Sequence, residues 1–172
     1  MKIAIIGYSG SGKSTLARKL GEKYHAPVLH LDTVQFLPQW EDRPVAEQTQ
    51  IVNAFLDSHD AWVIDGNYSK LSYARRMQEA DRIILLLFGR LCCLYRVVRR
   101  YRAYRNTTRP DMTADCKEKL DWAFVKWVLW EGRSKRAKQR YQGVIQAYPQ
   151  KAVVIKNQRQ LDAYLQAERS VK

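Results

Sequence analysis

Five short apolar runs alternate with amphipathic stretches along the chain. The runs are KIAIIG (2–7), VLHLD (28–32), AWVIDG (61–66), RIILLLF (82–88) and KAVVIKN (151–157). Their β-branched and leucine content, bounded by glycine, proline or polar residues, is typical of buried strands. The run at 82–88 is apolar on both faces, as is expected of a central strand in a parallel sheet.

The stretches between these runs carry apolar residues at helical spacing. The helix stripes are Leu16, Ala17, Leu20 and Tyr24; Ile51, Val52, Phe55 and Leu56 within 45–58; and Leu161, Tyr164 and Leu165. Strands that alternate with helices predict βαβ units and an α/β fold, whose parallel sheet is covered by helices on both faces. We expect residues 1–172 to form a single domain.

The segment from about 90 to 148 has a different character. Leu91, Leu94, Tyr95, Val98 and Tyr101 form a helical stripe among seven arginines: Arg90, Arg96, Arg99, Arg100, Arg102, Arg105 and Arg109. A predicted loop, NTTRPDMTAD (106–115), precedes a second long helix. We expect the aromatic residues of that helix to pack in the core: Trp122, Phe124, Trp127 and Trp130.

Composition narrows the possible partners. The chain has 30 Lys and Arg against 17 Asp and Glu, a formal net charge of +13, which favours polyanionic partners such as nucleotides or nucleic acid. Its three cysteines have no CxxC or Cys/His metal-ligand spacing, so we expect reduced thiols and a cytoplasmic location. The run at 83–88 is much shorter than a membrane span.

The stretch GYSGSGKST directly after the first strand is the sharpest chemical signal. It fits GxxxxGK[ST], the Walker A or P-loop pattern, in which glycines let main-chain N–H groups wrap a phosphate chain. The lysine reaches the β- and γ-phosphates, and the following serine supplies an oxygen to Mg²⁺. The residues predicted to bind ATP here are Gly7, Ser9, Gly10, Ser11, Gly12, Lys13, Ser14 and Thr15.

Two carboxylates are expected at the same sheet edge, because parallel strands bind ligands at their carboxyl ends. Asp65 ends the third strand and is the predicted second partner of Mg²⁺. Gly66 follows it, where many ATP-hydrolysing P-loop proteins place a glutamate that activates water. Asp32 ends the second strand and is placed to orient or deprotonate a substrate hydroxyl. This arrangement favours phosphoryl transfer to an acceptor over hydrolysis.

Two arginines support transfer. Arg96 and Arg100 lie four residues apart, on one face of the helix that follows the fourth strand. Cations that close over a moving phosphoryl group stabilise its developing charge and exclude water. The alternative is an ordinary solvated basic face.

The glycine loop, Asp32, the Asp65-Gly66 pair and the arginine-rich helix together resemble the P-loop kinases of small molecules, in the adenylate kinase and shikimate kinase group. The resemblance covers nearly the whole chain. It implies a five-stranded sheet in the order 2-3-1-4-5 and a mobile helical lid between the last two strands. It also implies that Arg96 lies near the adenine and donor phosphates, and Arg100 near the phosphates. The glycine loop and Asp65 predict ATP and Mg²⁺ as cofactors, and the sequence does not distinguish ATP from GTP as the donor.

The acceptor side departs from adenylate kinases. Their two AMP-gripping arginines fall here at Ser69 and near Gln35, so AMP is not the expected acceptor. Trp40, Arg43, Tyr68, Arg75 and Arg76 are predicted to form a different pocket, although packing is an equal alternative for Trp40. We also assign Asp65 and Asn67, beside Asp32, to the predicted substrate site.

HLD (30–32), PQWEDRP (38–44) and WVIDGNYS (62–69) further resemble bacterial proteins labelled DNA topology modulation proteins, which are kinase-like ATP-binding proteins. The leading hypothesis is an ATP-dependent kinase of a small molecule or nucleotide. The alternative is a nucleic-acid-associated ATP-binding protein, suggested by the net charge and by tyrosines interleaved with arginines.

Overall fold

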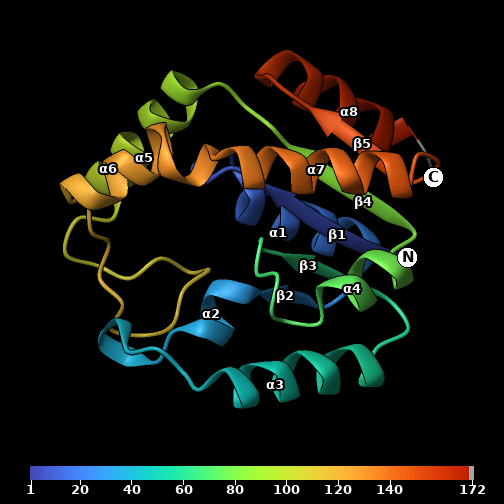
Figure 1. Ribbon diagram of the computed structural model, residues 1–172, viewed down its shortest axis with the longest axis horizontal. Coiled ribbons are helices and arrows are strands. Elements are labelled where there is room, and N and C mark those ends of the chain that lie inside the picture. Colours follow the sequence, from blue (N-terminus) through green and yellow to red (C-terminus); the bar gives the residue numbers. More distant parts are fainter. Residues whose placement is uncertain (171–172) are drawn as a thin grey trace.

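The computed structural model describes residues 1–170 and contains one five-stranded sheet (Figure 1). The strands are β1 (Lys2–Gly7), β2 (Val28–His30), β3 (Trp62–Asp65), β4 (Arg82–Leu86) and β5 (Ala152–Ile155). They are all parallel and lie in the order β2-β3-β1-β4-β5. The predicted α/β fold and strand order are therefore confirmed.

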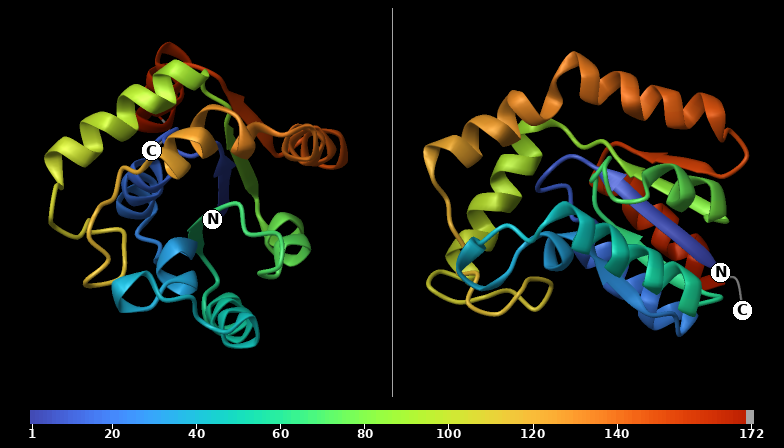
Figure 2. Two further views of the ribbon diagram at one scale, coloured as in Figure 1. Left: turned by 60° about the vertical axis from the view of Figure 1, so that its left-hand side comes forward. Right: turned by 60° about the horizontal axis from the view of Figure 1, so that its bottom comes forward.

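Helices cover both faces of the sheet, as Figure 2 shows from two further directions. On one face, Ile3 and Ile5 pack against α1 (Lys13–Tyr24), α5 (Arg90–Ala103), α6 (Trp122–Leu129) and α8 (Gln158–Ser170). On the other, Ala4 and Ile6 pack against α2 (Leu31–Gln35), α3 (Val45–Ser58), α4 (Tyr73–Glu79) and α7 (Lys135–Ala147). Alternate residues of one strand thus serve two hydrophobic cores, which is the geometry of a buried parallel strand.

The second strand is shorter than the sequence indicates. It ends at His30, and Leu31 and Asp32 belong to the first turn of α2. Leu31 and Val34 are three residues apart and both are buried in the core under α3, which is helical spacing. Asp32 therefore follows the strand edge on a short helix instead of ending the strand.

The predicted second long helix is divided. It consists of α6, the 3₁₀ turn η2 (Glu131–Arg133) and α7. At Trp130 the backbone leaves helical geometry, with φ −133° and ψ −63°. The turn closes tightly on α6, because a Cβ at Gly132 would lie 2.9 Å from the carbonyl oxygen of Trp127.

The expected core role of the aromatic residues in this region is wrong for the three tryptophans. Trp122, Trp127 and Trp130 are 65%, 48% and 52% exposed, while Val128 is the buried residue of α6. Phe124 packs at the margin of the core. A helix this short buries one narrow stripe, and in α6 that stripe does not include the tryptophans.

The loop between α5 and α6, residues 104–121 (the 104–121 loop), lies against α2 and the 3₁₀ turn η1 (Pro38–Trp40). Thr113 Oγ1 donates to the Phe36 carbonyl at 2.6 Å, and the Trp40 indole donates to the Lys117 carbonyl at 3.0 Å. These contacts join segments nearly eighty residues apart and enclose one side of the sheet's carboxyl edge. Within residues 1–170, no helix has the length and hydrophobicity needed to cross a bilayer.

Candidate active site

The glycine loop connects β1 to α1 at the carboxyl edge of the sheet. Gly7, Gly10 and Gly12 have φ of +144°, +75° and +94°, which strongly favour glycine. A Cβ at Gly7 would lie 2.3 Å from the Leu86 carbonyl oxygen, and one at Gly10 would lie 2.6 Å from that of Cys93. The loop therefore fits against β4 and α5 only because these positions lack side chains.

Lys13 extends from the start of α1 back over this loop. Its ammonium donates to the Tyr8 carbonyl at 3.1 Å, and the side chain lines a cavity of about 1520 Å³. Burial lowers the pKa of Lys13, although the negative charges of Asp65 and Asp32 oppose that shift. A cation held between these carboxylates is suited to meet phosphate oxygens that enter the cavity.

Arg96, which the resemblance places near the adenine and donor phosphates, lies against the glycine loop. Its guanidinium donates to the Ser11 carbonyl at 2.5 Å and to the side chain of Gln158, and it stacks on the Phe88 ring at 4.2 Å. Ser11 itself is buried and its N–H donates to the Tyr8 carbonyl at 3.2 Å, so its amide is not directed into the cavity. Ser9 and Thr15 do line the cavity.

Ser14 and Asp65 meet as a pair of oxygen ligands. The Ser14 hydroxyl donates to Asp65 Oδ2 at 3.0 Å, while Asp65 Oδ1 contacts His30 Nδ1. The strand register brings His30 opposite Asp65, so neighbouring strand ends build this contact. A hydroxyl beside a carboxylate fits Mg²⁺, which takes few protein oxygens and completes its shell with phosphate and water. Within residues 1–170, no group of three or more His, Cys, Asp or Glu residues forms a metal site of its own.

Asn67, predicted to contact the substrate, lines the cavity and also contacts the glycine loop. Its amide accepts from the Gly7 N–H at 2.9 Å and donates to the Gly7 carbonyl at 2.6 Å. Arg140 of α7 in turn donates to the Asn67 carbonyl at 3.2 Å. The side chain of Asn67 thus holds the first residue of the glycine loop, and we assign it to positioning.

Asp32 and Tyr68 form the acceptor side of the same cavity. The Tyr68 hydroxyl donates to Asp32 Oδ1 at 2.6 Å, and burial together with the charge of Asp32 raises the pKa of Tyr68 far above its ordinary value. Tyr68 therefore stays a neutral donor that fixes one carboxylate oxygen. The side chain of Asp32 is 43% exposed, so its other oxygen faces the cavity.

A buried charge network, which we call the loop network, closes over Asp32 from the 104–121 loop. Glu118 contacts Arg100 of α5 at 2.6 Å and Arg109 at 2.9 Å. Arg109 lies 3.5 Å from Asp111 and 3.9 Å from Asp32 Oδ2. Arg100, predicted to bind phosphate, thus has its guanidinium engaged by Glu118.

The protonation states of this network follow from its packing. Burial and the nearby charge of Arg109 lower the pKa of Arg100, with Glu118 opposing them. Burial raises the pKa of Asp111, but the charge of Arg109 and hydrogen bonding to the carboxylate outweigh burial and lower it. Asp111 is therefore ionised beside Arg109.

The sequence does not identify Arg109, Asp111 and Glu118 as site residues. Arg109 is one of seven arginines in its region, Asp111 stands in the predicted loop (106–115), and Glu118 follows that loop. The only sequence feature that could have indicated a charge network here is the alternation of opposite charges within residues 109–118. Trp127 is a further addition, since its indole donates to Ser9 Oγ at 3.1 Å across the mouth of the glycine loop.

The remaining predicted acceptor residues are divided by the structure. Trp40 and Arg43 line the cavity; the Trp40 ring meets Phe36 edge-to-face at 5.1 Å, so it also packs. Arg43 donates to the Val34 carbonyl at 2.9 Å and pairs with Glu47.

Arg75 and Arg76 do not reach the cavity. Arg75 is engaged by Asp57 and Glu79, each at 2.6 Å. Arg76 is fully buried and donates to the carbonyls of Leu71 and Tyr68 at 2.9 and 2.7 Å. Its pKa is lowered to about 10 by burial, and its role is to hold the chain that follows Gly66.

The strand order and the glycine loop together define an α/β P-loop fold. A scan against protein-family models finds no match, and no curated protein sequence is similar to the chain. Solved structures share the fold. A deoxyadenosine kinase from M. mycoides, solved with the products dCMP and dCDP, aligns over 100% of both chains with a TM-score of 0.52 and 14% identity. TT1252 from Thermus thermophilus aligns over 99% of this chain and 96% of that one, with a TM-score of 0.55 and 16% identity.

Proposed function

We propose that the chain is a phosphotransferase that moves the γ-phosphoryl group of ATP to a hydroxyl of a small molecule or nucleotide. One observation supports this proposal above the others. The carboxylate of Asp32, held by Tyr68, lines the same cavity as Lys13 and the glycine loop. A general base and a phosphate-binding cation facing one cavity is the arrangement that in-line transfer requires.

The proposed roles follow from the contacts. Main-chain amides of the glycine loop and Lys13 hold the donor phosphates, and Arg96 contacts the donor side. Ser14 and Asp65 hold Mg²⁺, which when bound neutralises phosphate charge. The acceptor hydroxyl gives its proton to Asp32 Oδ2, the oxygen that Tyr68 does not hold, as the hydroxyl oxygen attacks the γ-phosphorus, and ADP leaves.

The geometry near Asp65 supports transfer over hydrolysis. Gly66 has φ +141°, and a Cβ there would lie 2.7 Å from the Cβ of Leu31. A water-activating glutamate cannot occupy that position without displacing α2. Arg109 lies 3.9 Å from Asp32 Oδ2, which places a cation beside the carboxylate where the phosphoryl group would be transferred.

The test is product formation with a defined acceptor panel. Purified protein with Mg²⁺ and ATP is incubated with nucleosides, nucleoside monophosphates and hydroxylated metabolites, and products are identified by mass spectrometry. We expect ADP release that depends on one acceptor class and is lost in Asp32→Asn. The matched control is Asp42→Asn, since Asp42 is an exposed carboxylate that lines the same cavity. ATP turnover that ignores every acceptor would contradict the proposal.

A second candidate function is a nucleic-acid-associated ATP-binding protein, the role that the DNA topology modulation label suggests. It is favoured by the net charge of +13 and by exposed Arg99, Arg102 and Arg105, for which no carboxylate partner is found within residues 1–168. Binding to oligonucleotides should then fall steeply with salt and with alanine substitution at these three arginines. No affinity at low salt would exclude it.

A further inference from the structure

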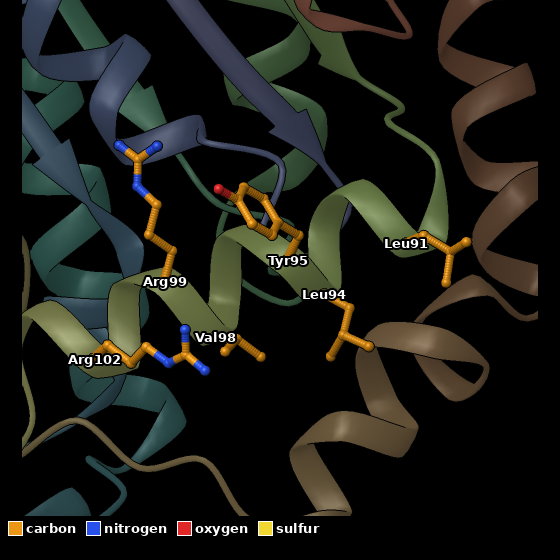
Figure 3. Close-up of a pocket in the computed structure, with 6 residues that line it drawn as sticks. All are labelled: Leu91, Leu94, Tyr95, Val98, Arg99 and Arg102. Atoms are coloured by element: carbon orange, nitrogen blue, oxygen red, sulfur yellow. The ribbon is translucent and has the colours of Figure 1, made fainter.

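One face of α5 has no use in the proposed reaction. A shallow pocket of about 380 Å³ is lined by Leu91, Leu94, Tyr95, Val98, Arg99 and Arg102 (Figure 3), and of these six Arg99 alone also lines the active-site cavity. All six come from successive turns of this one helix, and we call them the α5 stripe. Leu91 and Tyr95 are 78% and 65% exposed, which is unusual for large apolar side chains on consecutive turns.

The rest of α5 is occupied by the fold. Cys93 and Val97 are fully buried in the core, and Arg96 and Arg100 face the cavity. The α5 stripe lies on a third side of the helix, with Leu94 at its border with the core and Arg99 at its border with the cavity. Residues at i, i+3, i+4 and i+7 form a continuous ridge of the kind that packs against another helix.

The chemistry of the α5 stripe favours a protein partner over nucleic acid. Three of its members are aliphatic, whereas single strands are bound by aromatic platforms and cations. Its two cations, Arg99 and Arg102, stand at one end of the ridge. A partner must therefore present an apolar ridge with a carboxylate near one end.

A second copy of the chain presents that surface. If two α5 helices pack antiparallel about a twofold axis, Tyr95 lies opposite Val98, Leu94 opposite Arg99, and Leu91 opposite Arg102. Such an interface is self-complementary, as twofold symmetry demands. The aliphatic stems of the arginines cover the partner's leucines, and the Tyr95 ring can receive a guanidinium of the other copy.

Glu131 supplies the carboxylate at the correct end. Arg133 donates to the Phe88 carbonyl at 2.9 Å, which fixes the turn η2 beside the residues that begin α5. Glu131 is exposed and has no ion-pair partner among residues 1–168, and the same is true of Arg102. In the antiparallel pairing, Arg102 of one copy lies opposite the start of α5 in the other copy. Glu131 of that other copy lies beside the same end of its α5.

We propose that the α5 stripe is the interface of a twofold homodimer, sealed at each end by Arg102 of one copy and Glu131 of the other. This inference is independent of the proposed function. Specific interfaces bury about 800 Å² per partner, more than one helical ridge supplies. The exposed Trp130, next to Glu131, extends the apolar surface in the required direction.

The test is the mass of the full chain in solution. Sedimentation velocity and light scattering over a range of concentrations, with a reductant because Cys92 is exposed, should show a dimer of twice 20.2 kDa. Leu91→Glu should give a monomer with unchanged circular dichroism, because Leu91 is 78% exposed. Arg102→Glu should weaken the dimer at least about tenfold, because it places two carboxylates together.

The charge swap keeps the test decisive if a single variant folds poorly. Arg102→Glu combined with Glu131→Arg should restore the dissociation constant to within about threefold of the parent, as reciprocal pairs do in double-mutant cycles. Arg136→Glu on α7, an exposed arginine outside the stripe, is the matched control and should change nothing. A parent chain that stays monomeric at high concentration, or a charge swap that fails to restore the dimer, would overturn the proposal. A monomer that instead binds oligonucleotides through Arg99 and Arg102 would assign this face to nucleic acid.

Discussion

The two sides of the cavity are built by different means. The glycine-loop side is formed by main chain at strand ends: Gly7 against Leu86, Gly10 against Cys93, and Asn67 bracketing Gly7 with two hydrogen bonds. The acceptor side is formed by long charged side chains from the 104–121 loop, centred on Arg109 and Glu118. A phosphate-binding surface made of backbone is fixed by local sequence, whereas a surface made of paired side chains depends on how distant segments meet.

Removal of Lys13 tests the glycine-loop side and has the largest expected effect. In Lys13→Ala, phosphoryl transfer should fall roughly 10³-fold, because one preorganised cation facing developing phosphate charge is lost. Calorimetry with Mg–ATP should show weaker binding as well. Lys19→Ala is the matched control, since this lysine lies on the same helix, lines the same cavity and is exposed. If Lys13→Ala bound Mg–ATP and turned over substrate as the parent does, the glycine loop would not be the part that holds the triphosphate.

Loss of the Asp32 carboxylate separates the two sides of the cavity. Asp32→Asn keeps the hydrogen bond from Tyr68 but removes the proton acceptor, so turnover should fall roughly 10²-fold, as for other general bases. Affinity for Mg–ATP should stay within a factor of about two, because the donor side is untouched. The measurement is single-turnover transfer beside calorimetry on the same sample. Equal losses in both would show that Asp32 serves the donor instead.

The sequence predicts the glycine-loop side well for physical reasons. The strand, the glycine loop and the helix that follow one another here are consecutive in sequence. The local pattern therefore predicts that Lys13 lies over the loop and that Ser14 lies at the carboxyl ends of the strands. The pairing of Ser14 with Asp65 needs only the parallel neighbour β3. The spacing of Arg96 and Arg100 predicts only that they share a helix face; the expectation that Arg96 lies on the donor side comes from the resemblance to P-loop kinases.

The acceptor side resists prediction because its residues are brought together by the path of a loop. Nothing in the spacing of Arg109, Asp111 and Glu118 indicates that they fold back over Asp32, nearly eighty residues earlier. The prediction for Arg75 is wrong because its helix turns it toward Asp57 and Glu79. The tryptophans of α6 are expected in the core and are exposed instead. Aromatic residues are usually buried, but this tendency does not show which face of a short helix packs against the core.

Neutralising Glu118 tests whether the acceptor side depends on its charge network. Glu118→Gln leaves Arg100 and Arg109 buried beside an amide, so the free energy of unfolding should fall by about 2 kcal/mol, since an unpaired buried charge is costly. Acceptor KM should rise while the affinity for Mg–ATP is retained. Urea unfolding and steady-state kinetics measure the two effects. Asp57→Asn is the matched control, because its partner Arg75 lies outside the cavity and keeps its contact with Glu79. A stable variant with parental acceptor KM would show that the loop network does not shape the site.

The smallest effect is expected in the scaffold behind the glycine loop, where Glu168 of α8 ties to α1 and β4. Burial raises the pKa of Glu168, but hydrogen bonds from Tyr24 and Lys23 and the charge of Arg82 outweigh burial and lower it. A carboxyl whose folded pKa is depressed stabilises the fold above its unfolded pKa, near 4.5, and loses that stabilisation as pH falls through the folded pKa.

Glu168→Gln should therefore lower the free energy of unfolding by about 1 kcal/mol at pH 7, as measured by urea unfolding. The difference from the parent should narrow as the pH falls below about 4.5. Asp162→Asn, on the same helix and exposed, should show no comparable pH dependence. If the difference in unfolding free energy between parent and Glu168→Gln stayed constant from pH 7 to pH 3, Glu168 would act through packing and not through its charge. Main-chain and apolar contacts alone would then hold the glycine-loop side rigid.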